Sequence, residues 1–323
     1  MHHIHKTKAK KDILGFKVDL EKAYDRVNWD FLQKMFFQFG FPVITINLIM
    51  WCVRSGKVSL LWNGSRLEAF NPSRGLRQGD PMSSYLFVLC MEKLALLISQ
   101  KVDSGIWHPI KLSRGGPSIS HLLFADDVLL FCKATNSQVR FVSSTLNDFC
   151  KASGLKVSAD KSKFICSRSV TNRRKNRFMR LCSMRVVGNL GNYLGIPLLQ
   201  GRVGRAIFDP ILEKIQCRLA SWKANLLNRA GHLCLGKSVI SSIPVYYMQV
   251  LWFPNTVCNN INRMTRNFIW SGDVNSRGLH LVSWEVLTRR RRDNGLGIRD
   301  ARLSNISLLG KLCWSLISSN NKI

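Results

Sequence analysis

Three aspartates stand in apolar surroundings, where a carboxylate is costly to place. Asp19 lies in the run ILGFKVDL, and Asp126 and Asp127 separate the apolar segments LLF and VLLF. Carboxylates brought together raise one another's pKa, and a divalent cation removes that conflict. Hard oxygen ligands suit Mg²⁺ or Mn²⁺. The three aspartates therefore indicate a two-metal site, whose chemistry is the in-line displacement of phosphoryl transfer.

The aspartate pair also has a plainer interpretation. Aspartate is favoured in turns, and Asp126-Asp127 lies between two apolar segments that read as strands. Taken alone, the pair predicts a tight turn more readily than a catalytic site. The metal interpretation needs Asp19 on an adjacent strand and a basic environment.

The charge of the chain supplies that environment. The 323 residues have a net charge of +29, and 46% of them are hydrophobic, which excludes disorder. Such an excess of basic residues is typical of a protein that binds a polyanion, most often nucleic acid. Residues 1–160 hold 21 basic and 13 acidic residues, whereas residues 161–323 hold 27 and 6. We therefore expect chemistry in the first half and backbone binding in the second.

The elements that must position the aspartates follow from local signals. Residues 13–20 predict a strand. Asn28 reads as the N-cap of a helix over 29–39, Gly40 ends it, and Pro42 opens a second helix to about residue 54. Asn63-Gly64 between KVSLLW and SRLEAF is a strong hairpin signal.

Further along, a glycine-rich loop (GLRQGDP) precedes a long helix. Asp80 and Pro81 fit the N-cap and first turn of a helix to about residue 100. Residues 119–133 predict two strands hinged at residues 125–127. A helix over 137–152 ends at Gly154, and LKVS (155–158) predicts a short strand.

These elements predict an α+β fold with a mostly antiparallel sheet in the first half, because two hairpins occur and no regular βαβ repeat does. From residue 205 to 270 the apolar spacing is helical. We expect a tail at 1–12, a catalytic domain at 13–200, a helical domain at 201–275 and a basic extension at 276–323.

The cysteines and apolar segments bear on compartment. None of the ten cysteines forms a CxxC pair, which favours free thiols in a reducing compartment. The N-terminus has no signal-peptide pattern, and residues 239–253 are too short and interrupted to span a bilayer. We expect an intracellular protein, in nucleus or cytoplasm, that is neither secreted nor membrane-bound.

The segments KVDLEKAYDRVNWDFL, GLRQGDPMSSYLFVLCMEKL and LLFADDVLLF resemble, in order, the central palm motifs of reverse transcriptases. GLKVSADKSKFIC is similar to the next family motif, and YLGIPLL to the primer-grip region. The segment that begins ILEKIQCRLASWKANLL is similar to the thumb of LINE-type (non-LTR) retrotransposons, particularly those of plants. The resemblance covers about residues 13–310 and implies a palm, an antiparallel sheet with helices on one face, followed by a helical thumb.

The resemblance implies roles motif by motif. Asp19, Asp126 and Asp127 match the three catalytic acids, taken as ligands of Mg²⁺ or Mn²⁺, and the backbone carbonyl of Leu20 completes a metal shell. Tyr24 matches the aromatic residue that excludes a 2′-hydroxyl. The remaining matches are nucleotide-binding, Gln78, Gly79 and Lys161, or template- and primer-binding, Gly75, Arg77, Arg173, Arg174 and Lys175.

The implied reaction is RNA-templated DNA synthesis from a primer 3′-hydroxyl, with an RNA template, a DNA primer and deoxynucleoside triphosphates. Only about a dozen residues precede the first palm motif, so we expect a fragment without most of the fingers region or any endonuclease. Two alternatives stay open: a non-catalytic nucleic-acid-binding remnant, and a maturase-like RNA-binding protein. Ser158, where the family more often has Asn, is a departure from the family pattern.

Overall fold

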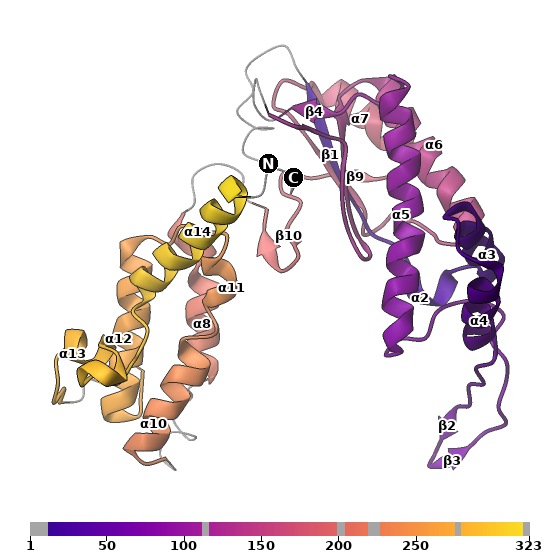
Figure 1. Ribbon diagram of the computed structural model, residues 1–323. Coiled ribbons are helices and arrows are strands. Elements are labelled where there is room, and N and C mark those ends of the chain that lie inside the picture. Colours follow the sequence, from indigo (N-terminus) through magenta and orange to yellow (C-terminus); the bar gives the residue numbers. More distant parts are fainter. Residues whose placement is uncertain (1–11, 112–115, 199–203, 219–226, 275–278, 319–323) are drawn as a thin grey trace. The chain divides into compact units, whose positions relative to one another are not determined.

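A computed structural model describes residues 12–111, 116–198, 204–218, 227–274 and 279–318 (Figure 1). Nearly all of the expected N-terminal tail, and the expected boundary at residue 200, lie outside these ranges. The chain forms two compact units, residues 1–201 and 202–323. Each unit has its own core and is described separately.

The first unit is built on a five-stranded sheet with the order β6-β7-β1-β8-β9. The central strand β1 (Ile13–Val18) pairs antiparallel with β7 (Asp127–Lys133) and with β8 (Lys163–Cys166). Strand β6 (His121–Phe124) pairs antiparallel with β7. The edge strand β9 (Arg185–Val186) runs parallel to β8, and the other three pairings are antiparallel, so the expectation of a mostly antiparallel sheet is confirmed.

The parallel pair has a topological cause. Helix α7 (Asn172–Cys182) connects β8 to β9 as a crossover, which returns the chain in the same direction. The prediction of a strand at 155–158 is wrong, because that segment forms only an isolated bridge between Val157 and Leu20.

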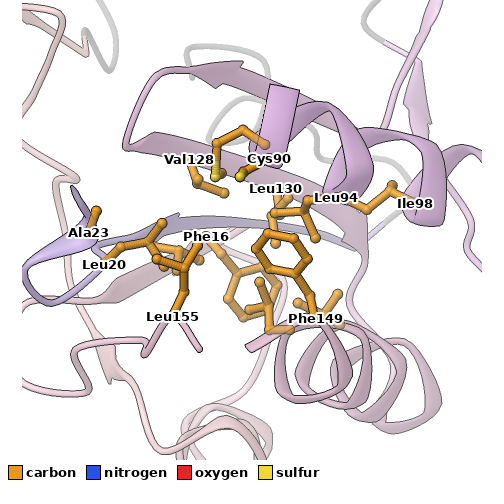
Figure 2. Close-up of a cluster of buried hydrophobic side chains, with 14 of the residues drawn as sticks. Phe16, Leu20, Ala23, Cys90, Leu94, Ile98, Val128, Leu130, Phe149 and Leu155 are labelled. Carbon is orange, nitrogen blue, oxygen red and sulfur yellow. The ribbon is translucent and has the colours of Figure 1, made fainter. Parts of the chain in front are cut away.

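One face of the sheet, which we call the helix face, is covered by helices. Its strand side chains include Phe16, Val18 and Leu130, and they pack in one core with α3 (Trp29–Gln38), α5 (Pro81–Asp103), α6 (Asn136–Ser153) and α7. Figure 2 shows this core, in which sheet residues meet residues of α5 and α6: Phe16, Val128, Leu130, Cys90, Leu94 and Phe149. Burial of these side chains is the main stabilising contribution to the unit.

The opposite face, which we call the hairpin face, has a smaller core. Here Leu129, Phe131 and Ile165 pack with residues of two short hairpins. These hairpins are β4 (Ile110–Lys111) with β5 (Ser118–Ile119), and β10 (Asn192–Tyr193) with β11 (Ile196–Pro197). In the described part of the first unit, the side chains that pack on this face therefore come from hairpins and loops.

Local signals correctly predict the helix starts and stops. The Asn28 side chain accepts hydrogen bonds from the first turn of α3, and Asp80 accepts one from Met82 N–H at 2.8 Å with Pro81 following. Gly154 ends α6 with a left-handed backbone. Helix α4 spans Val43–Arg54, a four-residue helix α2 spans Ala23–Arg26, and Asn63-Gly64 joins β2 (Leu61–Trp62) to β3 (Ser65–Arg66).

The second unit is helical, as its apolar spacing predicts. Its helices are η1 (Arg205–Ile207), α8 (Asp209–Arg218), α10 (Arg229–Leu235), η2 (Gly236–Ile240), α11 (Val245–Met248), α12 (Asn255–Ser271), α13 (Trp284–Thr288), η3 (Arg291–Asp293) and α14 (Ala301–Ser318). The fully buried rings of Phe208 and Phe253 pack with centroids 4.5 Å apart.

Helix α14 belongs to this same unit. The fully buried Asn305 side chain donates to the carbonyls of Met248 and Leu251, at 2.9 and 2.8 Å, and accepts from Phe253 N–H at 3.0 Å. The compact unit 202–323 therefore includes both the helices before residue 275 and the expected extension at 276–323, and a boundary at residue 275 stays a prediction.

Helix α5 is the one described helix long and apolar enough to cross a membrane by length and composition. In this fold α5 packs Leu86, Phe87, Cys90 and Leu94 into the core on the helix face, as a core helix does.

Candidate functional site

Asp19 directly follows the central strand β1, and both its backbone N–H and its backbone carbonyl form hydrogen bonds. The Asp19 N–H donates to the Ser162 hydroxyl at 3.0 Å, and the Ser158 N–H donates to the Asp19 carbonyl at 2.9 Å. Ser158 and Ser162 are both buried. The segment before β8 therefore fixes the backbone of the half-buried Asp19 at the end of β1.

Asp126 and Asp127 lie at the β6–β7 hairpin. Phe124 pairs with Asp127, so Ala125 and Asp126 form a two-residue turn. Ala125 adopts a φ of +49°, an uncommon backbone for a residue with a side chain. Asp126 is exposed at the turn, and Asp127 is the half-buried first residue of β7. Turn and carboxylate site thus coincide in one segment.

Strand register brings Asp19 and Asp127 together. The β1–β7 ladder ends with the pair Val18 and Val128, so one step further Asp19 comes opposite Asp127. Directly opposed residues of antiparallel strands project from the same face. Since Val18 and Val128 belong to the helix-face core, the two aspartates lie on the hairpin face.

The donor set suits a hard divalent cation, because it consists of carboxylate oxygens beside one another. In the described ranges, however, no group of three or more His, Cys, Asp and Glu side chains is close enough to hold a metal ion. The backbone therefore places two of the predicted ligands side by side, while the three carboxylates do not converge on one point. Binding would require rotation of side chains that are half-buried or exposed.

A lysine that the motif reasoning missed lies among these acids. Lys17 Nζ is 3.8 Å from Asp127 Oδ1 and donates a hydrogen bond to the Asn192 carbonyl. Burial, with a smaller contribution from the Asp127 charge, raises the pKa of Tyr193. The hairpin that starts at Asn192 therefore lies close to Asp127. The available signal was a lone lysine inside an otherwise apolar strand.

The loop that begins at Gly75 is bonded to the segment after β1. Gly75 N–H donates to Val27 O, Leu76 N–H donates to Tyr24 O, and Trp29 Nε1–H donates to Gly75 O, each at 2.8 Å. Gly75 has a φ of +91°, and a Cβ there would lie 2.8 Å from the Asp25 carbonyl oxygen. Only glycine fits this close approach.

The order of motifs, the paired aspartates and the docked loop agree with a family match. The family described as "Reverse transcriptase (RNA-dependent DNA polymerase)" matches residues 1–198. This chain belongs to the reverse transcriptase family. The expected resemblance to non-LTR, LINE-type elements is also confirmed by its relatives. Reverse transcriptases generally use divalent metal ions and a nucleic-acid template.

Relatives include plant and insect proteins. A putative ribonuclease H protein of Arabidopsis thaliana is 33% identical over 128 residues, which cover 40% of this chain and 21% of that protein. The Pol polyprotein of the type-2 retrotransposable element R2DM of Drosophila melanogaster is 29% identical over 144 residues, 45% of this chain and 13% of that one. A Pol polyprotein of an R2 element of Popillia japonica is 27% identical over 302 residues, 89% and 40% respectively.

The chain thus spans between about an eighth and two fifths of these relatives. Among solved structures, telomerase from Candida tropicalis in complex with a fragment of telomeric RNA aligns with 99% of this chain and 49% of that chain. The TM-score of this alignment is 0.42, and the sequence identity is 12%.

In this member of the family, Tyr24 is half-buried and its ring stacks on Phe87 of α5, with centroids 4.6 Å apart and planes at 17°. Its ring therefore packs on α5 while its backbone carbonyl is bonded to the loop at Leu76, and its role in excluding a 2′-hydroxyl stays a prediction. Leu20 is buried next to Asp19, and its backbone bridges to Val157.

The other predicted nucleotide contacts are exposed. Arg77, Gln78 and Gly79 lie at the surface of the loop, and the Arg77 guanidinium fills the space next to Gly56. Lys161 is exposed in the turn before β8, one residue from the buried Ser162. Among the described residues, no hydrogen bond or ion pair joins these residues to the three aspartates, so their roles stay predictions.

The predicted template contacts Arg173, Arg174 and Lys175 lie on α7. Arg174 binds Asp12 and the Ala134 carbonyl, and its guanidinium lies 5.8 Å from the centre of the Phe178 ring. Phe178 packs in the core on the helix face, opposite to the aspartates. Arg174 thus has partners within the first unit, and it lies with the exposed Arg173 and the half-buried Lys175 on a helix of the other face. Their contact with the template stays a prediction.

Proposed function

We propose that this chain provides the palm and thumb of a non-LTR reverse transcriptase and synthesises DNA on an RNA template. The observation that best supports the proposal is the register that sets Asp19 opposite Asp127 on the hairpin face, next to the Asp126 turn. The second unit would be the thumb and hold the template–primer duplex. We further propose that the protein acts inside the cell and is not bound to a membrane.

Each residue has a distinct task in this proposal. Asp19, Asp126 and Asp127 would hold Mg²⁺ or Mn²⁺ with the Leu20 carbonyl. Bound there, the ions would activate the primer 3′-hydroxyl and stabilise the pyrophosphate leaving group. Tyr24 would exclude a 2′-hydroxyl by bulk.

The loop from Gly75 to Gly79 would position the nucleotide and template, since its backbone is bonded to the Tyr24 segment. Arg77 and Gln78 would contact template and nucleotide from the exposed side of that loop, and Lys161 would lie near the leaving pyrophosphate.

The cysteines support an intracellular site of action. All ten are free thiols, and Cys52, Cys217, Cys234 and Cys313 are exposed. Exposed free thiols persist in a reducing compartment. Burial raises the pKa of Cys90 to about 12, so this thiol stays protonated and unreactive in the core.

Primer extension by the full chain tests the proposal. The substrate is an RNA template annealed to a DNA primer, with Mg²⁺ and deoxynucleoside triphosphates. We expect extension by the parent and none by the double variant Asp126→Asn with Asp127→Asn, because the ligands lose their charge. RNA binding, measured by fluorescence anisotropy, should stay within twofold of the parent.

Asp148→Asn is the matched control, because Asp148 is an exposed aspartate on α6, a helix of the other face. It should extend primers as the parent does. Extension by the double variant at the parent's rate would refute the site. RNA binding without extension by the parent would instead favour the non-catalytic or maturase-like alternative. The observation behind this alternative is that, among the described residues, the three carboxylates do not converge on one point.

A further inference from the structure

Lys17 is a lysine in the middle of the central strand, flanked on both sides by buried residues. Its neighbours Phe16 and Val18 belong to the helix-face core. Lys17 projects to the hairpin face, where it is in register with Leu129 on β7 and Lys163 on β8. Its side chain is only 22% exposed. An ammonium group placed there needs partners, because unpaired burial of a charge is costly.

Lys17 finds its two partners on segments far apart in the sequence. One is the Asp127 carboxylate, with Nζ 3.8 Å from Oδ1, at the start of β7. The other is the backbone carbonyl of Asn192, the first residue of the β10–β11 hairpin. A single ammonium group thus connects a carboxylate of the candidate metal site with a hairpin that packs on the same face.

We propose that Lys17 is a positioning residue that couples the hairpin at residues 192–197 to the Asp127 carboxylate. The inference rests on the proposed function, because it assigns a partner to one of the proposed metal ligands. A divalent cation at Asp127 competes with the Lys17 ammonium, since both are attracted to one carboxylate. Loading of the metal site and the position of the hairpin are then linked through one side chain.

The linkage has a direct consequence for cation affinity. Lys17→Met removes the competing charge and keeps most of the apolar stem. We expect Mn²⁺ to bind this variant at least about threefold more tightly than the parent, a size that fits a partly exposed ion pair. Lys17→Arg retains the positive charge and should stay within about twofold of the parent.

Lys163 offers a matched control. It stands beside Lys17 on the same face, is half-buried, and its Nζ lies near Gly191 at the start of the hairpin. Lys17 forms an ion pair with Asp127, whereas Lys163 forms none with any described residue. Lys163→Met removes the same charge from the same face, so a general charge effect would change both methionine variants alike.

The experiment measures two properties of the full chain: Mn²⁺ affinity by electron paramagnetic resonance, and amide hydrogen exchange of residues 191–198. Lys17→Met should bind Mn²⁺ more tightly and exchange its hairpin amides faster, because the bond to Asn192 is lost. Lys17→Arg and Lys163→Met should resemble the parent in both. Parental Mn²⁺ affinity together with parental exchange in Lys17→Met would overturn the proposal.

Failure of the proposed function gives a different result. A parent that binds no Mn²⁺ contradicts the metal site, but hydrogen exchange still tests the coupling. In that case Asp127→Asn should also accelerate hairpin exchange, because it releases the same lysine. Hairpin exchange that is unchanged in both Asp127→Asn and Lys17→Met would refute the coupling regardless of metal.

Discussion

Ser162 is fully buried, and its hydroxyl accepts the hydrogen bond of the Asp19 N–H. We predict that Ser162→Ala lowers the free energy of unfolding by about 1–3 kcal/mol, the usual cost of a buried donor without a partner. It should also slow primer extension, because the end of β1 loses the contact that fixes Asp19. Thermal unfolding and single-nucleotide incorporation rates measure the two effects.

Ser153→Ala separates these effects. Ser153 is equally buried, but its hydroxyl donates to the Phe149 carbonyl at 2.7 Å, within α6 on the helix face. We expect a similar loss of stability and an unchanged incorporation rate. Equal slowing by both variants would assign the effect of Ser162 to stability alone.

At the scale of elements, the loop before α5 depends on Gly75. We predict that Gly75→Ala destabilises the fold by more than about 1 kcal/mol, because the left-handed backbone and the Asp25 carbonyl at 2.8 Å both oppose a Cβ. Denaturant unfolding measures the change. Primer extension should fall as well, since the loop bonds to Tyr24 and Val27.

Gly79→Ala is the control within the same loop. Its φ is +92°, close to that of Gly75, but a Cβ there meets nothing within 4 Å. The loss of stability in Gly79→Ala therefore measures the cost of the left-handed backbone alone, without a steric clash of the new Cβ. A loss of stability as large as that of Gly75→Ala would contradict the close approach to Asp25 as the reason for glycine.

Element boundaries were predictable where the signal is local. The cap at Asn28, the Asp80-Pro81 start and the Gly154 stop each depend on residues within one turn, and each is confirmed. The turn at Asp126 was likewise predictable, because apolar strands flank it. Such signals need no knowledge of the rest of the fold.

Pairings between distant segments were not predictable in this way. Strand β8 replaces the strand expected at 155–158, because residues 163–166 pair with β1 while Val157 makes only one bridge. The parallel partner β9 and the Lys17–Asp127 pair likewise depend on strand order and register. Sequence patterns assign residues to strands, but only the sheet order determines which residues meet.

At the scale of the whole molecule, the family match and the division into units coincide. The match ends at residue 198, and the first unit ends at residue 201. The net charge is +8 for residues 1–160 and +21 for residues 161–323. Divided at residue 201, the net charge is +17 for the first unit and +12 for the second. Both units are therefore strongly basic, and the carboxylate site belongs to the unit that the family matches.

A local cluster of arginines in the second unit predicts where phosphates bind. Three exposed arginines lie within four residues of one another at η3 of the second unit: Arg289, Arg290 and Arg292. Replacing all three with glutamine should weaken binding of single-stranded RNA. Because each phosphate contact contributes about −0.7 to the slope of log affinity against log salt, the slope should become less steep by about 2. Fluorescence anisotropy at several salt concentrations measures it.

Net charge alone would give the same loss from any three cations, so the control replaces Lys34, Lys57 and Lys151 with glutamine. These lysines are exposed and dispersed over the first unit. Both triple variants have the same net charge, three below the parent, but only the arginines form a cluster that several adjacent phosphates can contact. A salt slope that changes equally in the two variants would mean that the chain binds RNA through its overall field, without a phosphate-binding site on the second unit.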